Sequence, residues 1–238
     1  MKLFAFVLIL LLCVTRQTVF AQKNDRPYQC GYYSKSFAEL KENYNHSSKY
    51  CNVQKGEQVA SIGVSNGYVE VQLATFNDGI HWTLQDIDTG CLNKSEFHKV
   101  LAYHEKLKGA PINGTFNLVA GSEHNTGLKR NFYDRVLLLN VYHELSDKDS
   151  ILIDIAGTLK QSGVVVIMER MAKKPGEKRK DCGKLKPVEP ELIAEMSRFG
   201  FTLSQKEIAD EKILLTFYTF SIQQRTVKVL NTQSTAKE

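Results

Sequence analysis

The chain has 238 residues, of which 42% are hydrophobic and 24% are charged, and its formal net charge is +5. This length and apolar content suit one globular domain with a well-buried core. The positive charge is too mild to indicate a nucleic-acid-binding protein, and we expect no nucleic-acid partner.

Residues 1–21 have the pattern of a secretory signal peptide. Lys2 gives a positive start, an unbroken apolar run extends from Leu3 to Val14, and Val19-Phe20-Ala21 precedes a cleavage site at Gln22. The run is too short to span a bilayer comfortably, although an uncleaved N-terminal anchor is the alternative interpretation. We therefore expect an exported protein, periplasmic or secreted, with no membrane contact after cleavage.

Residues 22–34 are polar and predict a loose N-terminal arm. Phe37, Leu40 and Tyr44 then recur at helical spacing. This spacing predicts a short amphipathic helix over residues 35–50.

The remainder of the chain alternates between strand and helix patterns. Strands are predicted over residues 58–62, 80–87, 116–120, 135–141 and 163–169, and helices over residues 67–76, 93–107, 147–160 and 189–199. Two final strands, residues 201–208 and 213–222, are joined by the turn 209–212 as an antiparallel hairpin. Because alternating strands and helices form doubly wound sheets, we predict an α/β domain over residues 35–222. It has a mostly parallel seven-stranded sheet, a terminal antiparallel hairpin, helices on both faces, and a polar tail over residues 223–238.

Four cysteines would remain after signal cleavage: Cys30, Cys51, Cys91 and Cys182. An even number in an exported chain permits disulfides. Cys30 and Cys51 are the first choice for a pair because both flank one short N-terminal segment, and unpaired buried thiols are the alternative. The spacing of the four cysteines matches no zinc motif, so no metal is expected.

A glycine-rich turn follows the first predicted strand. The sequence Ile62-Gly63-Val64-Ser65-Asn66-Gly67 leads from that strand into a helix. Gly63 allows a tight turn, the small Ser65 lets the backbone approach a ligand, and Gly67 allows close packing at the helix start. The free N–H groups of a helix start favour anions. The turn is therefore a candidate nucleotide-binding loop, although the same pattern also occurs in unrelated turns.

The second predicted strand ends in an acid. Asp86 lies 19 residues beyond Gly67, and an acid about 20 residues past such a turn commonly binds ribose hydroxyls. A carboxylate forms strong charge-assisted hydrogen bonds with hydroxyl groups. Asp88 follows closely, and a helix N-cap is the alternative interpretation of that residue.

The order of these motifs resembles the class I S-adenosylmethionine-dependent methyltransferases. That family has a glycine-rich turn after strand one, an acid after strand two, a polar motif after strand three, and a strand-four segment that leads to a histidine. The matching segments here are Ile62 to Gly67, Asp86, Gly121-Ser122-Glu123, and Phe132 to Val136 leading to Asn140 to Leu145. The stretch Arg198-Phe199-Gly200-Phe201 resembles the family's turn before its final hairpin. The resemblance covers roughly residues 35–221.

The resemblance implies S-adenosylmethionine as the cofactor and a small-molecule substrate as the partner. The implied cofactor-binding residues follow the strand ends: Gly63, Ser65 and Gly67 on the methionine side, Asp86 at the ribose, Ser122 and Glu123 beside the adenine, and Asn140 closing the pocket. The chain departs from the family at Ser61 and Ser122, where an acid is usual, and at Ser65, where glycine is usual. Glu57 and Glu123 are candidates to compensate.

Three residues directly after the fourth predicted strand are candidate catalytic residues: Tyr142, His143 and Glu144. Methyl transfer needs mainly alignment and removal of the acceptor's proton. His143 is a candidate general base because a free histidine titrates near neutral pH, and Glu144 is a candidate to orient the acceptor. Structural roles at the strand end are the alternative, and Glu169 after the fifth strand is a further candidate.

A basic loop and two histidines are interpreted as solvent-exposed. Residues 171–187 form a basic loop, and such charge runs are commonly solvated. Attraction of an acidic substrate is the alternative for this loop. His98 and His104 lie on a predicted helix without the spacing of a metal motif.

The sequence thus favours transfer of a methyl group from S-adenosylmethionine to a small molecule. The alternative is a catalytically inactive ligand-binding or interaction protein on the same scaffold, because fold does not fix function and the cofactor is made inside cells. An NAD-dependent oxidoreductase fits the terminal hairpin less well. The sequence does not predict the oligomeric state.

Overall fold

The computed structural model describes residues 26–222, so the expected signal peptide and the expected tail lie outside the described residues. The helices are α2 (Phe37–His46), α3 (Tyr68–Phe76), α4 (Lys94–Lys108), α5 (Lys148–Thr158) and α6 (Glu189–Arg198), with short 3-10 helices η1 (Ser48–Cys51) and η2 (Tyr142–Glu144). The strands are β1 (Gln58–Ile62), β2 (Ile80–Asp86), β3 (Gly114–Ala120), β4 (Tyr133–Leu139), β5 (Leu159–Arg170), β6 (Phe201–Asp210) and β7 (Leu215–Ile222).

The seven strands form one sheet with the order β3-β2-β1-β4-β5-β7-β6. The first five strands in this order pair in parallel, whereas β7 pairs antiparallel with both β5 and β6. The predicted α/β fold, with its mostly parallel sheet and terminal antiparallel hairpin, is confirmed.

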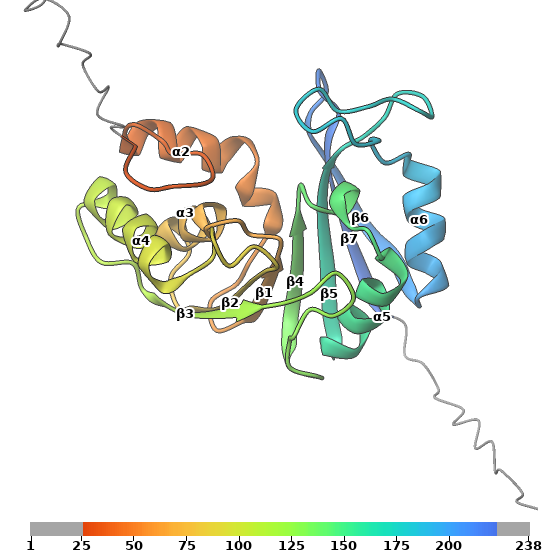
Figure 1. Cartoon of the computed structure of the whole chain (residues 1–238), viewed down its shortest axis with the longest axis horizontal. Coiled ribbons are helices and arrows are strands. Elements are labelled where there is room, and N and C mark those ends of the chain that lie inside the picture. Colours follow the sequence, from red (N-terminus) through yellow and green to blue (C-terminus); the bar gives the residue numbers. More distant parts are fainter. Residues whose placement is uncertain (1–25, 223–238) are drawn as a thin grey trace, which may run out of the picture.

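Helices cover both faces of the sheet, as the alternation of apolar residues requires (Figure 1). On β4, Val136 and Leu138 pack into the core formed with α5 and α6, whereas Leu137 between them packs into the core on the face of α3 and α4. All three side chains are fully buried. A strand that is apolar on both faces is typical of the centre of a parallel sheet.

The register of the central strands brings their carboxyl ends to one edge. Ile62 at the end of β1 is paired with Gln85 on β2 and with Leu138 on β4. In open α/β sheets, ligands bind outside the carboxyl ends of the strands, where the strand order reverses. That reversal lies here between β1 and β4, so the glycine-rich turn after Ile62 is at the expected edge.

The N-terminal segment is packed rather than loose over residues 26–34, which corrects the expected arm. Tyr28 is buried and stacks on His104, with a ring separation of 6.4 Å. The backbone N–H of Gln29 donates to Glu96 on α4, and the Asn66 side chain donates to the carbonyls of Gln29 and Cys30. The segment therefore lies across the starts of α3 and α4.

This packing also corrects two expectations about single residues. Cys30 forms a disulfide with Cys91, not with Cys51, because the arm carries Cys30 to the loop before α4. Cys51 is a buried free thiol in the core beside α3. His104 is buried beneath Tyr28 instead of lying on a solvated helix face, and desolvation lowers its pKa.

Within residues 26–222, no helix combines the length and the apolar character needed to cross a bilayer.

Candidate functional site

The turn between β1 and α3 depends on three residues with positive φ. Gly63 has φ +69°, Ser65 has φ +56° and Gly67 has φ +82°. The backbone N–H of Gly63 donates to the carbonyl of Gln85, which ties the turn to the end of β2. Left-handed backbone favours glycine, so Ser65 is the position in this turn with the less favourable conformation.

Gly67 allows close packing of the helix start and does not line a cavity beside the turn. A Cβ atom at this position would lie 2.8 Å from the Leu84 side chain and 3.3 Å from the ring of Phe97. Absence of a side chain therefore lets the start of α3 approach β2 and α4, which is the packing role predicted for this glycine. Gly67 lines neither of the two cavities that flank the turn and are described below.

Asp86 holds the glycine-rich turn. Its carboxylate accepts one hydrogen bond from the backbone N–H of Ser65 at 2.6 Å and another from the N–H of Asp88 at 2.8 Å. Each carboxylate oxygen retains a further acceptor position. Asp88 caps the following turn, where it accepts from the N–H groups of Gly90 and Cys91, while Asn93 is the N-cap of α4.

A cavity of about 450 Å³ lies between the glycine-rich turn and the ends of β2 and β4. It brings together six of the predicted cofactor-binding and catalytic residues: Gly63, Ser65, Asp86, Ser122, Glu123 and Glu144. Gln85 also lines it, and the buried Oε1 of that side chain has no hydrogen-bond partner among the described residues. The side chain of Lys184 reaches the same cavity from the basic loop.

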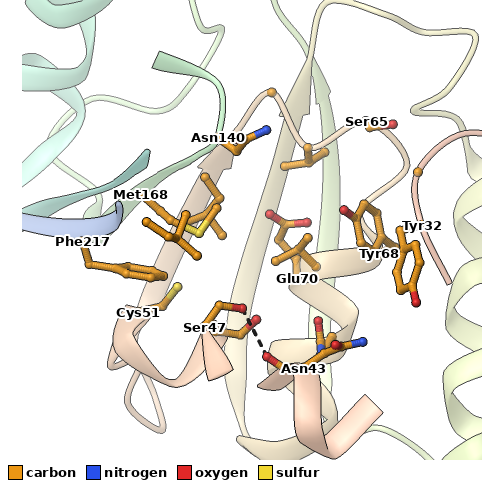
Figure 2. A pocket seen from close by; sticks show the side chains of 18 of the residues that line it. Tyr32, Asn43, Ser47, Cys51, Ser65, Tyr68, Glu70, Asn140, Met168 and Phe217 are labelled. Atoms are coloured by element: carbon orange, nitrogen blue, oxygen red, sulfur yellow. Dashed lines mark hydrogen bonds between the residues drawn. The ribbon is translucent and has the colours of Figure 1, made fainter. Parts of the chain in front are cut away.

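A second cavity, of about 460 Å³, lies on the other side of the turn and shares Gly63 and Ser65 with the first. Figure 2 shows Glu70 in the middle of its lining, between Asn140 and Met168 on one side and Tyr68 on the other. We call the cavity beside Asp86 the Asp86 cavity and the cavity beside Glu70 the Glu70 cavity. Together they flank the turn on both sides.

Glu70 is a site residue that the sequence analysis missed. It lies on α3, and its Oε1 accepts a hydrogen bond from the Ser61 hydroxyl, while its buried Oε2 has no partner among the described residues. Burial raises the pKa of this carboxyl to about 7. The available signal was the position of Glu70, three residues after Gly67 and on a helix with no other charged residue.

Glu57 does not compensate for the missing acid at Ser61. It lies before β1, at the opposite end of the strand, where both of its carboxylate oxygens accept hydrogen bonds from the Arg135 guanidinium at 3.0 and 3.1 Å. Glu123 does lie at the Asp86 cavity and accepts a hydrogen bond from Ser146. The acid nearest to Ser61 is instead supplied by α3.

The three candidate catalytic residues point in different directions from η2. The buried Tyr142 hydroxyl donates to Glu195 on α6, and Tyr142 lines neither cavity. The His143 side chain is fully buried. Glu144 is half exposed and lines the Asp86 cavity.

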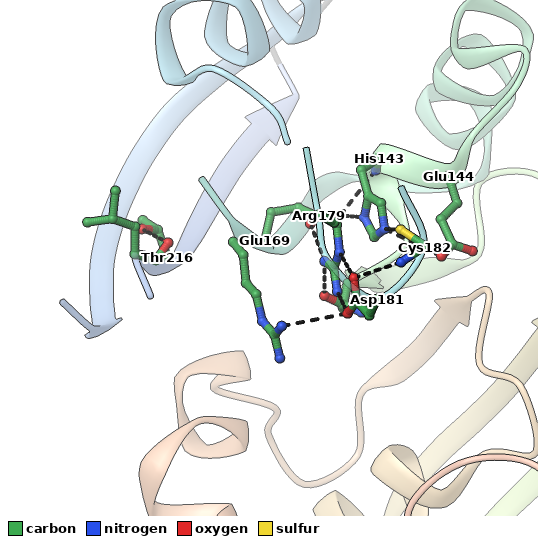
Figure 3. Close-up of polar contacts among 10 residues, drawn as sticks. His143, Glu144, Glu169, Arg179, Asp181, Cys182 and Thr216 are labelled. Carbon is green, nitrogen blue, oxygen red and sulfur yellow. Dashed lines mark hydrogen bonds and ion pairs between the residues drawn. The ribbon is translucent and has the colours of Figure 1, made fainter. Parts of the chain in front are cut away.

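His143 belongs to a polar cluster between η2, β5 and the basic loop (Figure 3). Its Nδ1 lies 2.8 Å from Oε1 of the buried Glu169, and its Nε2 lies 3.6 Å from the sulfur of Cys182. Arg179 donates to Asn140 at 2.5 Å, and its guanidinium lies 3.6 Å from the second oxygen of Glu169.

The basic loop is therefore only partly solvated. Its lysines at positions 173, 174, 178 and 180 are exposed, as expected, but Arg179 is buried. Asp181 accepts hydrogen bonds from Nε and Nη2 of Arg179, and that pairing lowers the pKa of Asp181. The loop is anchored through one arginine, which donates to Asn140 after β4 and pairs with Glu169 on β5.

The chain is similar to known proteins in its fold but not in its sequence. No protein-family model matches the chain, and no curated protein is similar to it in sequence. Among solved structures, a SAM-dependent methyltransferase from Aquifex aeolicus is similar, with a TM-score of 0.54, 12% identity, and coverage of 79% of this chain and 98% of that chain. The glycopeptide N-methyltransferase MtfA, complexed with S-adenosyl-L-homocysteine, has a TM-score of 0.54 and 13% identity, with coverage of 82% and 90%.

The cyclase SpnF is similar to the same degree, with a TM-score of 0.54, 15% identity, and coverage of 78% of this chain and 67% of that chain. The chain therefore has the Rossmann-like fold of the class I S-adenosylmethionine-dependent methyltransferases. Since a cyclase shares the fold, the activity has to be argued from the site.

Proposed function

We propose that this protein binds S-adenosylmethionine across the Gly63–Gly67 turn and transfers its methyl group to a small molecule. The observation that carries the proposal is the placement of one carboxylate on each side of the turn. Asp86 lies at one cavity and Glu70 at the other, and both cavities share Gly63 and Ser65.

The charges of the two cavities suit the two ends of this cofactor. The buried Oε2 of Glu70 has no hydrogen-bond partner among the described residues, and a buried unpaired carboxylate is costly unless a cation pairs with it. The amino-acid end of the cofactor carries an ammonium and lies next to the sulfonium. We assign this end to the Glu70 cavity.

The nucleoside end is assigned to the Asp86 cavity. The free acceptor positions of Asp86 suit ribose hydroxyls, and the unpartnered Oε1 of Gln85 is an acceptor for an amino group of the base. Ser122 and Glu123 line the same cavity from the loop after β3. Asn140, held by Arg179, lines the Glu70 cavity at the end of β4.

The cofactor supplies an activated methyl group, so the chain's residues have mainly to align the two reactants and exclude water. Met168 and Phe217 form an apolar wall of the Glu70 cavity beside Asn140. This wall leaves room for a small organic acceptor next to the amino-acid end of the cofactor.

Calorimetric titration of S-adenosylmethionine into the purified protein tests the proposal. We expect one site per chain, and we expect Asp86→Ala to weaken binding by more than about tenfold, since hydrogen bonds to charged groups contribute about 1.5–3 kcal/mol. The control is Asp78→Asn. Asp78 lies just before β2, is exposed, and pairs with Lys108 at the end of α4. Absence of binding at millimolar cofactor overturns the proposal.

The second candidate function is binding of a ligand without methyl transfer. It is favoured by the disulfide Cys30–Cys91, because disulfides persist in oxidising compartments, where the cofactor is not made. We propose export of the chain on the same ground, together with the signal-like residues 1–21. Binding of S-adenosylmethionine with no transfer to any panel of small hydroxyl, amine and thiol acceptors would favour this second function.

A further inference from the structure

We propose that His143, Glu144 and Cys182 form a binding site for a zinc ion. The three side chains come from η2 and from the basic loop, and one donor atom from each lies within 4.8 Å of the others. Figure 3 shows them side by side at the edge of the polar cluster.

Two of the three separations between the donor atoms match a tetrahedral ion. Nε2 of His143 lies 3.6 Å from the sulfur of Cys182 and 3.4 Å from Oε1 of Glu144. Around a zinc ion with bonds of about 2.0–2.3 Å, neighbouring ligand atoms are about 3.3–3.6 Å apart. The two distances therefore correspond to two edges of a zinc tetrahedron.

The histidine is oriented as a metal ligand. Oε1 of Glu169 accepts from the backbone N–H of His143 at 3.1 Å and lies 2.8 Å from Nδ1 of its ring. A neutral imidazole that donates from Nδ1 presents its lone pair at Nε2, toward Cys182 and Glu144. A buried carboxylate behind a histidine is the usual support of a zinc ligand. Both side chains of this pair have no exposed surface.

The charges around the site also favour a cation. Glu144 and Glu169 flank the two ring nitrogens of His143, while Asp181 pairs with the guanidinium groups of Arg170 and Arg179. A thiolate at Cys182 adds a further negative charge when zinc binds and the thiol proton passes to solvent. Sulfur, nitrogen and oxygen donors together select zinc over magnesium or calcium.

Three protein ligands leave one position of the tetrahedron open, which water fills. Because Glu144 lines the Asp86 cavity, the ion would stand in the wall of that cavity. It would also fasten the basic loop to η2. With His143 and Glu144 on the ion, neither is free to take a proton from an acceptor, so the inference replaces their expected catalytic roles.

Zinc and cobalt titrations of the metal-free protein, without cofactor and with the thiol kept reduced, test the inference. We expect one zinc ion per chain, and with cobalt a sulfur-to-metal charge-transfer band in the near ultraviolet. Cys182→Ser, at an exposed position, should remove the band and weaken zinc binding by more than about tenfold. Glu144→Gln should weaken binding with the band retained.

The matched control is His98→Gln, since His98 is exposed on α4 and far from the cluster in sequence. It should leave zinc binding and the cobalt band unchanged. No binding at tens of micromolar zinc, or binding that Cys182→Ser leaves intact, overturns the inference. Either result is independent of cofactor binding, which is tested separately by calorimetry on the wild type and Asp86→Ala.

Discussion

The Ser61 hydroxyl donates a hydrogen bond of 2.6 Å to Oε1 of Glu70, and both side chains are buried. Ser61 stands where the family that the sequence resembles usually has an acid. In this chain the carboxylate reaches the same place from α3. A carboxyl group therefore lies beside the glycine-rich turn, but it belongs to α3.

The buried Glu70 makes stability depend on pH. Burial raises its pKa from 4.5 to about 7, so between these values the folded protein holds a proton that the unfolded chain has lost. The stability that this group contributes is fully present below pH 4.5 and is lost as the pH rises to about 7, a loss of about 3 kcal/mol.

Glu70→Gln removes this titration, so relative to the wild type its free energy of unfolding should be higher at about pH 8 than at about pH 5. Urea denaturation at the two pH values measures the difference. Glu42→Gln, on the exposed face of α2, serves as the control. An equal pH dependence in Glu70→Gln and the wild type would show that Glu70 is not the titrating group.

Cofactor binding should release a proton from Glu70. At about pH 7 roughly half of these carboxyls are protonated, and an ammonium placed beside the carboxylate lowers its pKa. Calorimetry in two buffers with different ionisation enthalpies should therefore give different apparent binding enthalpies. The difference should shrink in Glu70→Gln. A buffer-independent enthalpy in the wild type would place the ammonium elsewhere.

Substitutions at Gly63 and Gly109 separate two reasons for a glycine: a left-handed backbone and the lack of space for a side chain. Gly63 and Gly109 have φ of +69° and +74°, but a Cβ at Gly63 would lie 2.3 Å from Val141, whereas nothing lies within 4 Å of one at Gly109. Gly109→Ala should cost about 1–2 kcal/mol of stability, from the left-handed backbone alone. Gly63→Ala adds overpacking of about 1–3 kcal/mol.

Gly63→Ala should also lower the affinity for S-adenosylmethionine, whereas Gly109→Ala should leave it unchanged. Denaturation and calorimetry on the two variants supply both measurements. Equal losses of stability would mean that Val141 moves away at no cost and that the turn tolerates a side chain.

The disulfide fixes the N-terminal segment over the starts of α3 and α4. Cys30 and Cys91 are separated by 61 residues, and a loop of this length corresponds to about 4 kcal/mol in the chain-entropy model. Cys30→Ser, Cys91→Ser and the double variant should therefore lose the same stability under non-reducing conditions. Cys182→Ser, at an exposed free thiol, is the control when all variants are measured without metal. Additive losses in the double variant would show that the two cysteines do not act as a pair.

The fold was predictable from the sequence because its signals are local. Leu137 and its neighbours on β4 are apolar on both faces, and Gly63 and Gly67 mark the turn into α3. The order of such segments defines the sheet without any knowledge of contacts. The same local reasoning placed Asp86, Ser122 and Glu123 after the strands whose ends line one cavity.

The contacts between distant segments were not predictable in this way. Glu70 pairs with Ser61 through the packing of α3 on β1, and Cys30 meets Cys91 because the arm folds across α4. Cys182 reaches His143 only because the basic loop folds back through Arg179. Each of these pairs depends on side-chain directions that periodicity does not specify.

A crystal structure of the protein with S-adenosylhomocysteine tests whether the cofactor binds across the glycine-rich turn. We expect one ligand that spans the Gly63–Gly67 turn, with its ribose hydroxyls bonded to Asp86 and its ammonium beside Glu70. The absence of the ligand from both cavities at millimolar concentration, or a ligand that leaves the Asp86 and Glu70 carboxylates untouched, would contradict it.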